Sequence, residues 1–237
     1  FIHVAEKTGL MRELTAWVLR SATSAVTAWR SMGWHRACVA INVSAPQFFE
    51  SDFVERVVEA LRVTGLPPSA LELEITETVL QTGPATIQAL ERLRELGVEI
   101  ALDDFGTGFS SLTSLQQLPI TRVKLDRSLI EAIDTSARSA AIARSVIALC
   151  HGLGLQVVAE GIERPEQLDA LSQCGPICVQ GFLLAQAVET EAVPEEVQAA
   201  AQRARDVMYR ARDSAADVSL SEQESLVFVT PRRIAPR

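Results

Sequence analysis

Oxygen-bearing side chains that could bind divalent cations recur along the sequence, each near the end of a short apolar run. Four are carboxylates and one is an amide, and these hard donors suit Mg²⁺ or Mn²⁺. Two such ions about 4 Å apart need several oxygen ligands, with at least one carboxylate between them. The candidate metal ligands are Asn42, Glu74, Asp103, Asp104 and Glu160.

The adjacent residues Asp103 and Asp104 end an apolar run and are followed at once by Phe-Gly-Thr-Gly. Neighbouring residues in a strand face opposite sides, but at a strand end both carboxylates can turn towards one site. Gly106 and Gly108 permit such a turn and a close approach of the loop to a ligand. We expect both carboxylates at one site, although an Asp-Asp pair before a glycine is often only a turn.

Lys124, within the run Val-Lys-Leu-Asp, is the cationic candidate. Its ammonium could hold a phosphate oxygen or orient an attacking water, or it could form a structural ion pair. Glu77 and Glu163 each lie three residues after a proposed ligand, so we expect them to brace loops around the site. Gln180 could hydrogen-bond to a substrate or to a ligand.

Short strands and helices alternate along the chain and must position these residues. The helical stretches have apolar residues at three- and four-residue intervals, and glycines fall where helices should stop. Repeated strand–helix units predict a parallel sheet covered by helices. The predicted strands are Cys38–Ser44, Leu71–Glu77, Glu99–Phe105, Thr121–Arg127, Gln156–Ile162 and Ile177–Leu183; the helices are Phe53–Val63, Thr86–Leu96, Ala137–Gly152 and Pro165–Gln173, with stops at Gly65, Gly97, Gly154 and Gly175.

An open doubly wound sheet and a closed barrel both fit this alternation. An open sheet usually has one crevice and a Gly-rich loop after its first strand. Here polar groups follow all six strands, as expected where every strand end faces a barrel mouth. We predict an α/β fold, a TIM-type (β/α)₈ barrel. Because such a barrel needs eight strands, we expect its first two to be absent from this chain, and residues 1–30 to be the helical segment that follows them.

The composition fits one large domain, because 48% of the 237 residues are apolar and 22% are charged. We place the barrel at residues 1–200 and a charged helical or linker tail at residues 201–237. No apolar run approaches the roughly 18 residues of a membrane span, which favours a cytoplasmic location. Segments of the full protein that precede Phe1 could still anchor it to a membrane.

Charge and cysteine spacing argue against two other classes of protein. The net charge of −8 disfavours binding to a nucleic-acid polymer. The four cysteines lack a CxxC pair and are predicted to be reduced, buried thiols rather than zinc ligands.

Six segments resemble those of the EAL domain family, the cyclic di-GMP phosphodiesterases of bacterial second-messenger signalling. The resemblance implies a hydrolase, dependent on Mg²⁺ or Mn²⁺, that opens one phosphodiester of cyclic di-GMP to give linear pGpG. It implies that the five candidate ligands hold two ions, with Asp103 as the bridge, and that Lys124 assists the nucleophilic water. The segments are AINVSAPQF, LELEITET, ALDDFGTGFSSL, ITRVKLDRS, VVAEGIE and VQGF, within residues 1 to about 188.

The same resemblance assigns roles to the remaining candidates. Gln180 and Glu163 match site residues placed near the substrate, together with Lys124. Glu77 matches a glutamate that steadies the loop after Asp104, a loop that in this family also helps to form a dimer, so it joins Lys124 and Glu160 among the catalytic candidates. The resemblance further implies a homodimer and an upstream sensory or GGDEF-type domain.

Two departures from the family pattern leave alternatives open. The Glu-Ala-Leu motif, which in this family supplies a further metal ligand, belongs to a part of the family pattern that precedes Phe1, and residues 1–237 do not show whether the intact protein carries it. We expect weak or no activity from residues 1–237 alone. The segment LLAQAV replaces a usual proline after Gln180-Gly181-Phe182. The alternatives are a non-catalytic module that binds cyclic di-GMP as a receptor and a metal-dependent barrel enzyme that abstracts a proton with Lys124.

Overall fold

A computed structural model of the chain describes residues 4–5, 8–107 and 112–213. These residues fall into two compact units. The first holds the residues up to Leu102 and the segment 112–120, and the second holds residues 103–107 and 121–213. Strand β3 contributes to both units, since it spans Glu99–Phe105.

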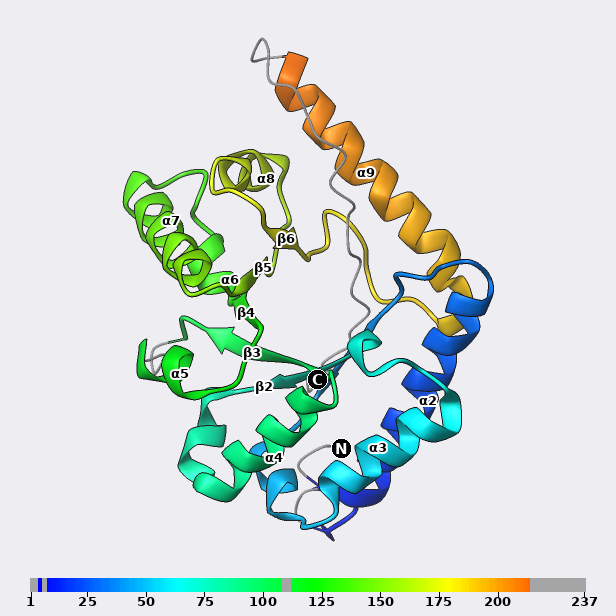
Figure 1. The fold of residues 1–237 in the computed structure, drawn as a ribbon. Coiled ribbons are helices and arrows are strands. Elements are labelled where there is room, and N and C mark those ends of the chain that lie inside the picture. Colours follow the sequence, from blue (N-terminus) through cyan, green and yellow to red (C-terminus); the bar gives the residue numbers. More distant parts are fainter. Residues whose placement is uncertain (1–3, 6–7, 108–111, 214–237) are drawn as a thin grey trace. The chain divides into compact units, whose positions relative to one another are not determined.

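The first unit is built from strand–helix repeats (Figure 1). Its long helix α2 packs against α3 and β1, and α3 contacts α4. The buried side of α2 includes Leu19 and Val26. The elements are α2 (Met11–Ser31), β1 (Val39–Asn42), α3 (Phe53–Thr64), β2 (Leu71–Ile75), α4 (Pro84–Glu95), the first part of β3 and α5 (Leu112–Gln117), with 3-10 turns η1 (Ala45–Phe49), η2 (Pro68–Ala70) and η3 (Glu77–Thr82).

The second unit continues the same alternation (Figure 1). Helix α7 contacts β5 and α6, and α8 contacts α9. A stripe of small and apolar residues, including Ala143 and Ile147, buries one face of α7. Besides the end of β3, the elements are β4 (Arg122–Leu125), α6 (Arg127–Ile130), α7 (Ala137–Gly152), β5 (Gln156–Ala159), α8 (Pro165–Ser172), β6 (Cys178–Val179), the 3-10 turn η4 (Thr190–Ala192) and α9 (Val193–Asp213).

The strands form a sheet in sequence order. Among the described residues there are six, in the order β1-β2-β3-β4-β5-β6. The pairs β1–β2, β2–β3, β4–β5 and β5–β6 are parallel. Every residue of β2 and β4 is buried, as expected for parallel strands covered on both faces. All carboxyl ends therefore lie at one edge of each unit's part of the sheet, which is where the candidate residues were predicted.

The predicted elements are confirmed in position, with shorter strands than expected. Each observed strand lies within a predicted one, and β3 has the predicted bounds. All four glycines predicted to stop helices have positive φ, including Gly65 at 70°, whose N–H donates to the Leu61 carbonyl at the end of α3. The short helices α5 and α6 were not predicted.

The C-terminal prediction is tested only in part, because residues 214–237 lie outside the described residues. Residues 201–213 are helical, but they continue α9, which begins at Val193. The domain boundary at residue 200 thus stays a prediction. In the part of the chain that the structure describes, no helix is both long and apolar enough to cross a membrane.

The cysteines are free, as predicted, but only Cys150 is fully buried. Cys38, Cys174 and Cys178 are half-buried, so their predicted burial is wrong. The reason lies in their positions: Cys38 precedes β1, Cys174 follows α8, and Cys178 begins the two-residue strand at the end of the strand order. Burial raises the pKa of the Cys150 thiol to about 11.

Candidate active site

Two predicted metal ligands meet in the first unit. Asn42 ends β1 and Glu74 lies in β2, and the two residues are register partners in the parallel pair. The Asn42 side-chain nitrogen Nδ2 donates to Glu74 Oε2 at 2.9 Å. Glu74 is only 1% exposed, and a buried carboxylate needs a hydrogen-bond donor or a cation. The pair therefore presents hard oxygen donors at a strand end.

The second unit brings three candidates together around one ammonium group. Lys124 Nζ lies 3.1 Å from Asp103 Oδ1 and 2.7 Å from Glu160 Oε1. The Asp126 N–H donates to the Phe105 carbonyl and the Glu160 N–H donates to the Leu125 carbonyl, which aligns the strand ends. This geometry confirms the ion pairing that was considered for Lys124, and it places the lysine between two candidate ligands.

One cation therefore faces two carboxylates in this cluster. Burial is the main factor that raises the pKa of Glu160; the Lys124 charge and hydrogen bond oppose it, and the negative charges of Asp103 and Asp104 add to it. The cluster carries an excess of negative charge in a poorly solvated place. A bound divalent cation would compensate that charge.

Asp104 has a left-handed backbone, with φ of 55°. It is the one non-glycine residue with positive φ in the described segments, and such a conformation costs about 1–3 kcal/mol. The turn expected after the carboxylate pair thus begins on Asp104 itself and continues through Gly106, with φ of 109°. A side chain at Gly106 would also collide with Leu129, since its Cβ would lie 2.3 Å from Cδ1. Gly108 lies outside the described residues.

The other candidates lie on loops next to these clusters. Glu77 is half-buried and begins η3, just after β2. Gln180 is half-buried and follows β6; its N–H donates to the Ala159 carbonyl, and its carbonyl accepts from Ile162. Glu163 forms two hydrogen bonds with Arg127, a residue that the sequence reasoning missed.

The oxygen donors of the candidate residues fit a hard divalent cation. In the segments that the structure describes, no three or more His, Cys, Asp or Glu side chains lie close enough together to hold an ion. The candidates occur instead as the Asn42–Glu74 pair and the Asp103–Lys124–Glu160 cluster. Each unit thus supplies carboxylate oxygens at or near its strand ends, and within the second unit Lys124 partly balances Asp103 and Glu160.

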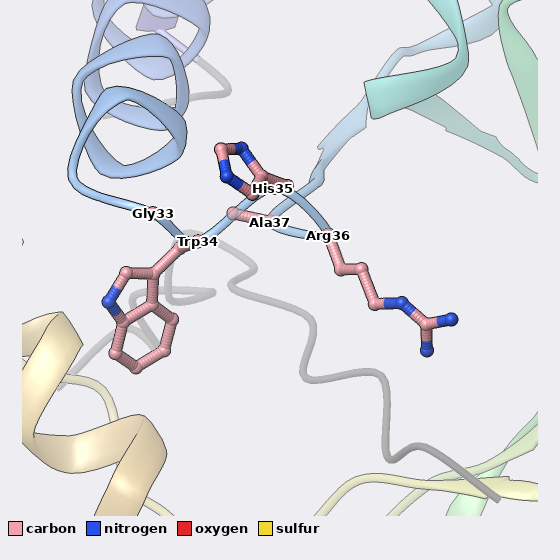
Figure 2. A pocket seen from close by; sticks show the side chains of 5 residues that line it. All are labelled: Gly33, Trp34, His35, Arg36 and Ala37. Atoms are coloured by element: carbon pink, nitrogen blue, oxygen red, sulfur yellow. The ribbon is translucent and has the colours of Figure 1, made fainter.

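A hollow of about 370 Å³ lies elsewhere, between the end of α2 and the start of β1. Figure 2 shows that the side chains of Trp34, His35 and Arg36 diverge rather than converge on a common point. The loop precedes β1, at the opposite end of that strand from Asn42. None of the candidate residues lines the hollow, so we assign it no part in the chemistry.

Comparison with known proteins decides the family. The EAL domain family matches residues 1–187. The chain belongs to the EAL domain family. The cyclic di-GMP phosphodiesterase NbdA of Pseudomonas aeruginosa is 42% identical over 200 residues, which are 84% of this chain and 26% of NbdA. The bifunctional diguanylate cyclase/cyclic di-GMP phosphodiesterase MucR of the same species is 40% identical over 192 residues, covering 81% of this chain and 28% of MucR.

Solved EAL structures have the same fold. The P. aeruginosa MucR phosphodiesterase in complex with c-di-GMP superposes with a TM-score of 0.75 at 39% identity, covering 81% of this chain and 78% of that one. The EAL domain of Mycobacterium smegmatis DcpA superposes with a TM-score of 0.72 at 38% sequence identity, and the match covers 78% of this chain and 84% of that one. These likenesses confirm the predicted TIM-type architecture, of which the described residues supply six strands. The chain spans about a quarter to a third of the curated relatives it matches.

Proposed function

We propose that this EAL domain hydrolyses cyclic di-GMP to linear pGpG in a reaction that depends on divalent metal ions. The family and the names of its relatives support hydrolysis of this substrate. The observation that carries the proposal is the Lys124 ammonium, which is held between Asp103 and Glu160 where β3, β4 and β5 end. Because the chain and the two phosphodiesters of the substrate are both negatively charged, they repel each other, and bound cations would offset this repulsion.

The proposed cations are Mg²⁺ or Mn²⁺, held by oxygen atoms of the five candidate ligands. When bound, such ions lower the pKa of a water nucleophile and neutralise charge on the phosphoryl oxygens. The resemblance to the EAL family implies that Asp103 would be the bridging ligand; it belongs to the buried cluster and adjoins the left-handed turn at Asp104. The proposed ligands are Asn42, Glu74, Asp103, Asp104 and Glu160.

The remaining candidates would orient the reactants. The Lys124 ammonium donates hydrogen bonds and can hold a water or a phosphoryl oxygen in line with the scissile bond. Gln180 would hydrogen-bond to the substrate from the loop after β6, and Glu163 lies on the loop after β5. Glu77 would steady the loop after Asp104.

Assembly and location are also proposals. We infer a homodimer, and an upstream sensory or GGDEF-type domain in the full gene product, as in relatives that join cyclase and phosphodiesterase activities in one name. We place the domain in the cytoplasm because its proposed substrate is an intracellular second messenger. A receptor that binds cyclic di-GMP without cleaving it is the competing function, and the intact candidate ligands favour the enzyme.

Parallel measurement of turnover and binding tests the proposal on the full gene product and its Asp103→Asn variant. With Mn²⁺ present we expect pGpG from the wild type and at least a hundredfold lower kcat from the variant, because an amide is a poor bridge between cations. Far-UV circular dichroism would show that the variant folds. Wild-type rates in the variant would remove Asp103 from the bridge, and tight binding without turnover in the wild type would support the receptor.

A further inference from the structure

Arg127 and Glu163 form an ion pair that joins two loops of the second unit. Arg127 begins α6, just after β4, and Glu163 lies on the loop after β5. Arg127 Nη1 donates to Glu163 Oε1 at 2.7 Å, and Nη2 donates to Oε2 at 3.1 Å. Because the guanidinium and the carboxylate are both planar, two parallel hydrogen bonds fix the relative orientation of the two side chains as well as the distance between them.

The stem of Arg127 also packs against the backbone next to Glu160. Gly161 has φ of 71°, and a Cβ added there would lie 2.7 Å from Cγ and 2.8 Å from Cβ of Arg127. Only glycine lets the loop pass this close to the arginine. Arg127 therefore touches the residue directly after Glu160 and binds the residue three positions after it.

Backbone hydrogen bonds hold the start of the same segment. The Glu160 N–H donates to the Leu125 carbonyl at 3.1 Å, and the Ile162 N–H donates to the Gln180 carbonyl at 3.1 Å. These bonds join the segment to the end of β4 and to the loop after β6. Arg127 adds side-chain contacts to the same segment, at Gly161 and at Glu163.

The far end of the segment is anchored by Gln167, which is 1% exposed. Its Oε1 accepts from the N–H groups of Glu163 at 2.9 Å and Arg164 at 3.0 Å. The Arg164 guanidinium in turn donates to both carboxylate oxygens of Asp134. Glu163 is thus held by its backbone as well as by its carboxylate, which leaves that carboxylate pointed at Arg127 rather than free to follow a substrate.

We propose that Arg127 is a positioning residue of this site, which acts through Glu163 and Gly161 to fix the segment that carries Glu160. Glu163 then serves mainly as the partner of Arg127. This inference rests on the proposed function for its kinetic consequences, but not for its effect on metal affinity. A residue that holds a metal ligand in position without contacting the metal itself matters for binding and turnover. Its removal typically lowers metal affinity or activity by about 10- to 100-fold.

The test compares the full gene product with Arg127→Ala, Glu163→Ala and the double variant. The control is Arg62→Ala, since Arg62 donates to both oxygens of Glu59 in the same way but lies exposed on α3. Two quantities are measured: the dissociation constant of Mn²⁺ without substrate, from the electron paramagnetic resonance signal of free Mn²⁺, and kcat and KM for pGpG formation.

We expect Arg127→Ala and Glu163→Ala each to weaken Mn²⁺ binding and lower kcat about tenfold, with KM changed less than threefold. The double variant should be no worse than either single one, because both remove the same interaction. Arg62→Ala should match the wild type. If Arg127→Ala does not fold, Arg127→Lys should give a smaller loss in the same direction, since lysine lacks the planar fork.

The inference is overturned if Arg127→Ala (or Arg127→Lys) retains wild-type Mn²⁺ affinity and kcat, or if the losses multiply in the double variant. A rise in KM in Glu163→Ala alone would likewise overturn it, by making Glu163 a direct substrate contact. Wild-type protein that binds Mn²⁺ but forms no pGpG would refute the proposed function, and the Mn²⁺ titration would still decide the role of Arg127. Wild-type protein that binds no Mn²⁺ would contradict both.

Discussion

Lys124 is the residue on which the candidate chemistry depends most directly. Its side chain is 6% exposed and lies against Asp103, which is 7% exposed, and Glu160, which is 20% exposed. Asp103 lies in β3 and Lys124 in β4, and Glu160 directly follows β5, so their contact follows from the order of these three strands. An ammonium in this position keeps the two carboxylates together and leaves one negative charge for a cation.

Replacement of Lys124 by methionine should lower kcat by about a hundredfold or more, because the group that orients the water or phosphoryl oxygen is lost. The metal-free protein should also lose about 3 kcal/mol in the free energy of unfolding, since two buried carboxylates are left without their cation. Kinetics of pGpG formation and urea unfolding measure the two effects. Arg138→Met on the exposed side of α7 is the control. A wild-type kcat in Lys124→Met would exclude the proposed role.

At this scale the sequence places Asn42, Glu74, Asp103 and Glu160 at or near the carboxyl ends of parallel strands, and the structure agrees. Their role as metal ligands stays a prediction. The sequence does not predict Arg127. That pairing joins residues 36 positions apart and depends on α6 beginning directly after β4. The left-handed backbone of Asp104 was also beyond reach, since the following glycines offered an easier place for the turn.

At the scale of elements, the loops after β5 and β6 pack backbone against backbone. A Cβ at Gly181 would lie 2.1 Å from the carbonyl oxygen and 2.3 Å from the nitrogen of Ile162. The same residues exchange hydrogen bonds, since Ile162 donates to Gln180 and Leu183 donates to Ile162. The glycine after Gln180 is therefore required by packing rather than by chemistry.

Gly181→Ala should lower the free energy of unfolding by about 2 kcal/mol, because backbone atoms cannot move aside as a side chain can. It should also reduce turnover, since the loops that carry Gln180 and Glu160 must separate. Gly152→Ala in α7 is the matched control: no atom lies within 4 Å of its added Cβ, and alanine should stabilise the helix by about 0.5–1 kcal/mol. Urea unfolding of both variants measures the contrast, and equal effects would contradict the packing argument.

A pH-dependent contribution comes from Asp134, which Arg164 links to the loop after β5. The hydrogen bond from Arg164 is the main factor that holds the pKa of Asp134 below its usual value. A lowered pKa stabilises the folded protein above the unfolded pKa of about 3.9, and this stabilisation is lost as the pH falls through the folded pKa. Asp134→Asn should therefore cost about 1 kcal/mol at pH 7, allowing for screening at the partly exposed Arg164.

The difference between Asp134→Asn and the wild type should shrink as the pH falls through the folded-state pKa of Asp134, because protonation removes the charge that Arg164 stabilises. Chemical unfolding of both proteins at pH 7 and pH 2.5 measures this difference in the free energy of unfolding. A difference of equal size at both pH values would show that the aspartate acts through packing.

The elements themselves follow closely from the sequence, because the apolar periods and the stopping glycines are local signals. The strands are shorter than predicted where loops take over their carboxyl ends, most clearly at β6, which has two residues. The helices α5 and α6, with six and four residues, are too short to show a helical period.

At the scale of the whole molecule, α9 extends beyond the residues that match the EAL family. The match ends at residue 187, and α9 runs from Val193 to Asp213. Val193 and Ala200 are buried. Arg203 donates to the Leu184 carbonyl and to Glu196, so the helix is tied to the loop that follows Gln180. The sequence predicted a charged helical or linker tail from residue 201, whereas α9 begins at Val193. The contacts of this helix with the loop after Gln180 were not predicted, since a charged helix carries no sequence signal of its partner.

Arg203→Ala should loosen this attachment. Loss of a charged hydrogen bond, worth about 1.5 kcal/mol, should speed amide hydrogen exchange in α9 about tenfold. Arg205→Ala is the control, because Arg205 is exposed and contacts only Gln202 on the same helix among the contacts described. Equal exchange rates in the two variants would show that Arg203 does not secure the helix.

We propose that this EAL domain cleaves cyclic di-GMP with the help of bound metal ions. The most direct measurement is a time course of the full gene product with cyclic di-GMP and Mn²⁺, with pGpG separated by chromatography, and a parallel sample in excess EDTA. We predict that pGpG accumulates only when the metal is present. Cyclic di-GMP that stays intact with Mn²⁺, or pGpG that forms equally in EDTA, would contradict the account.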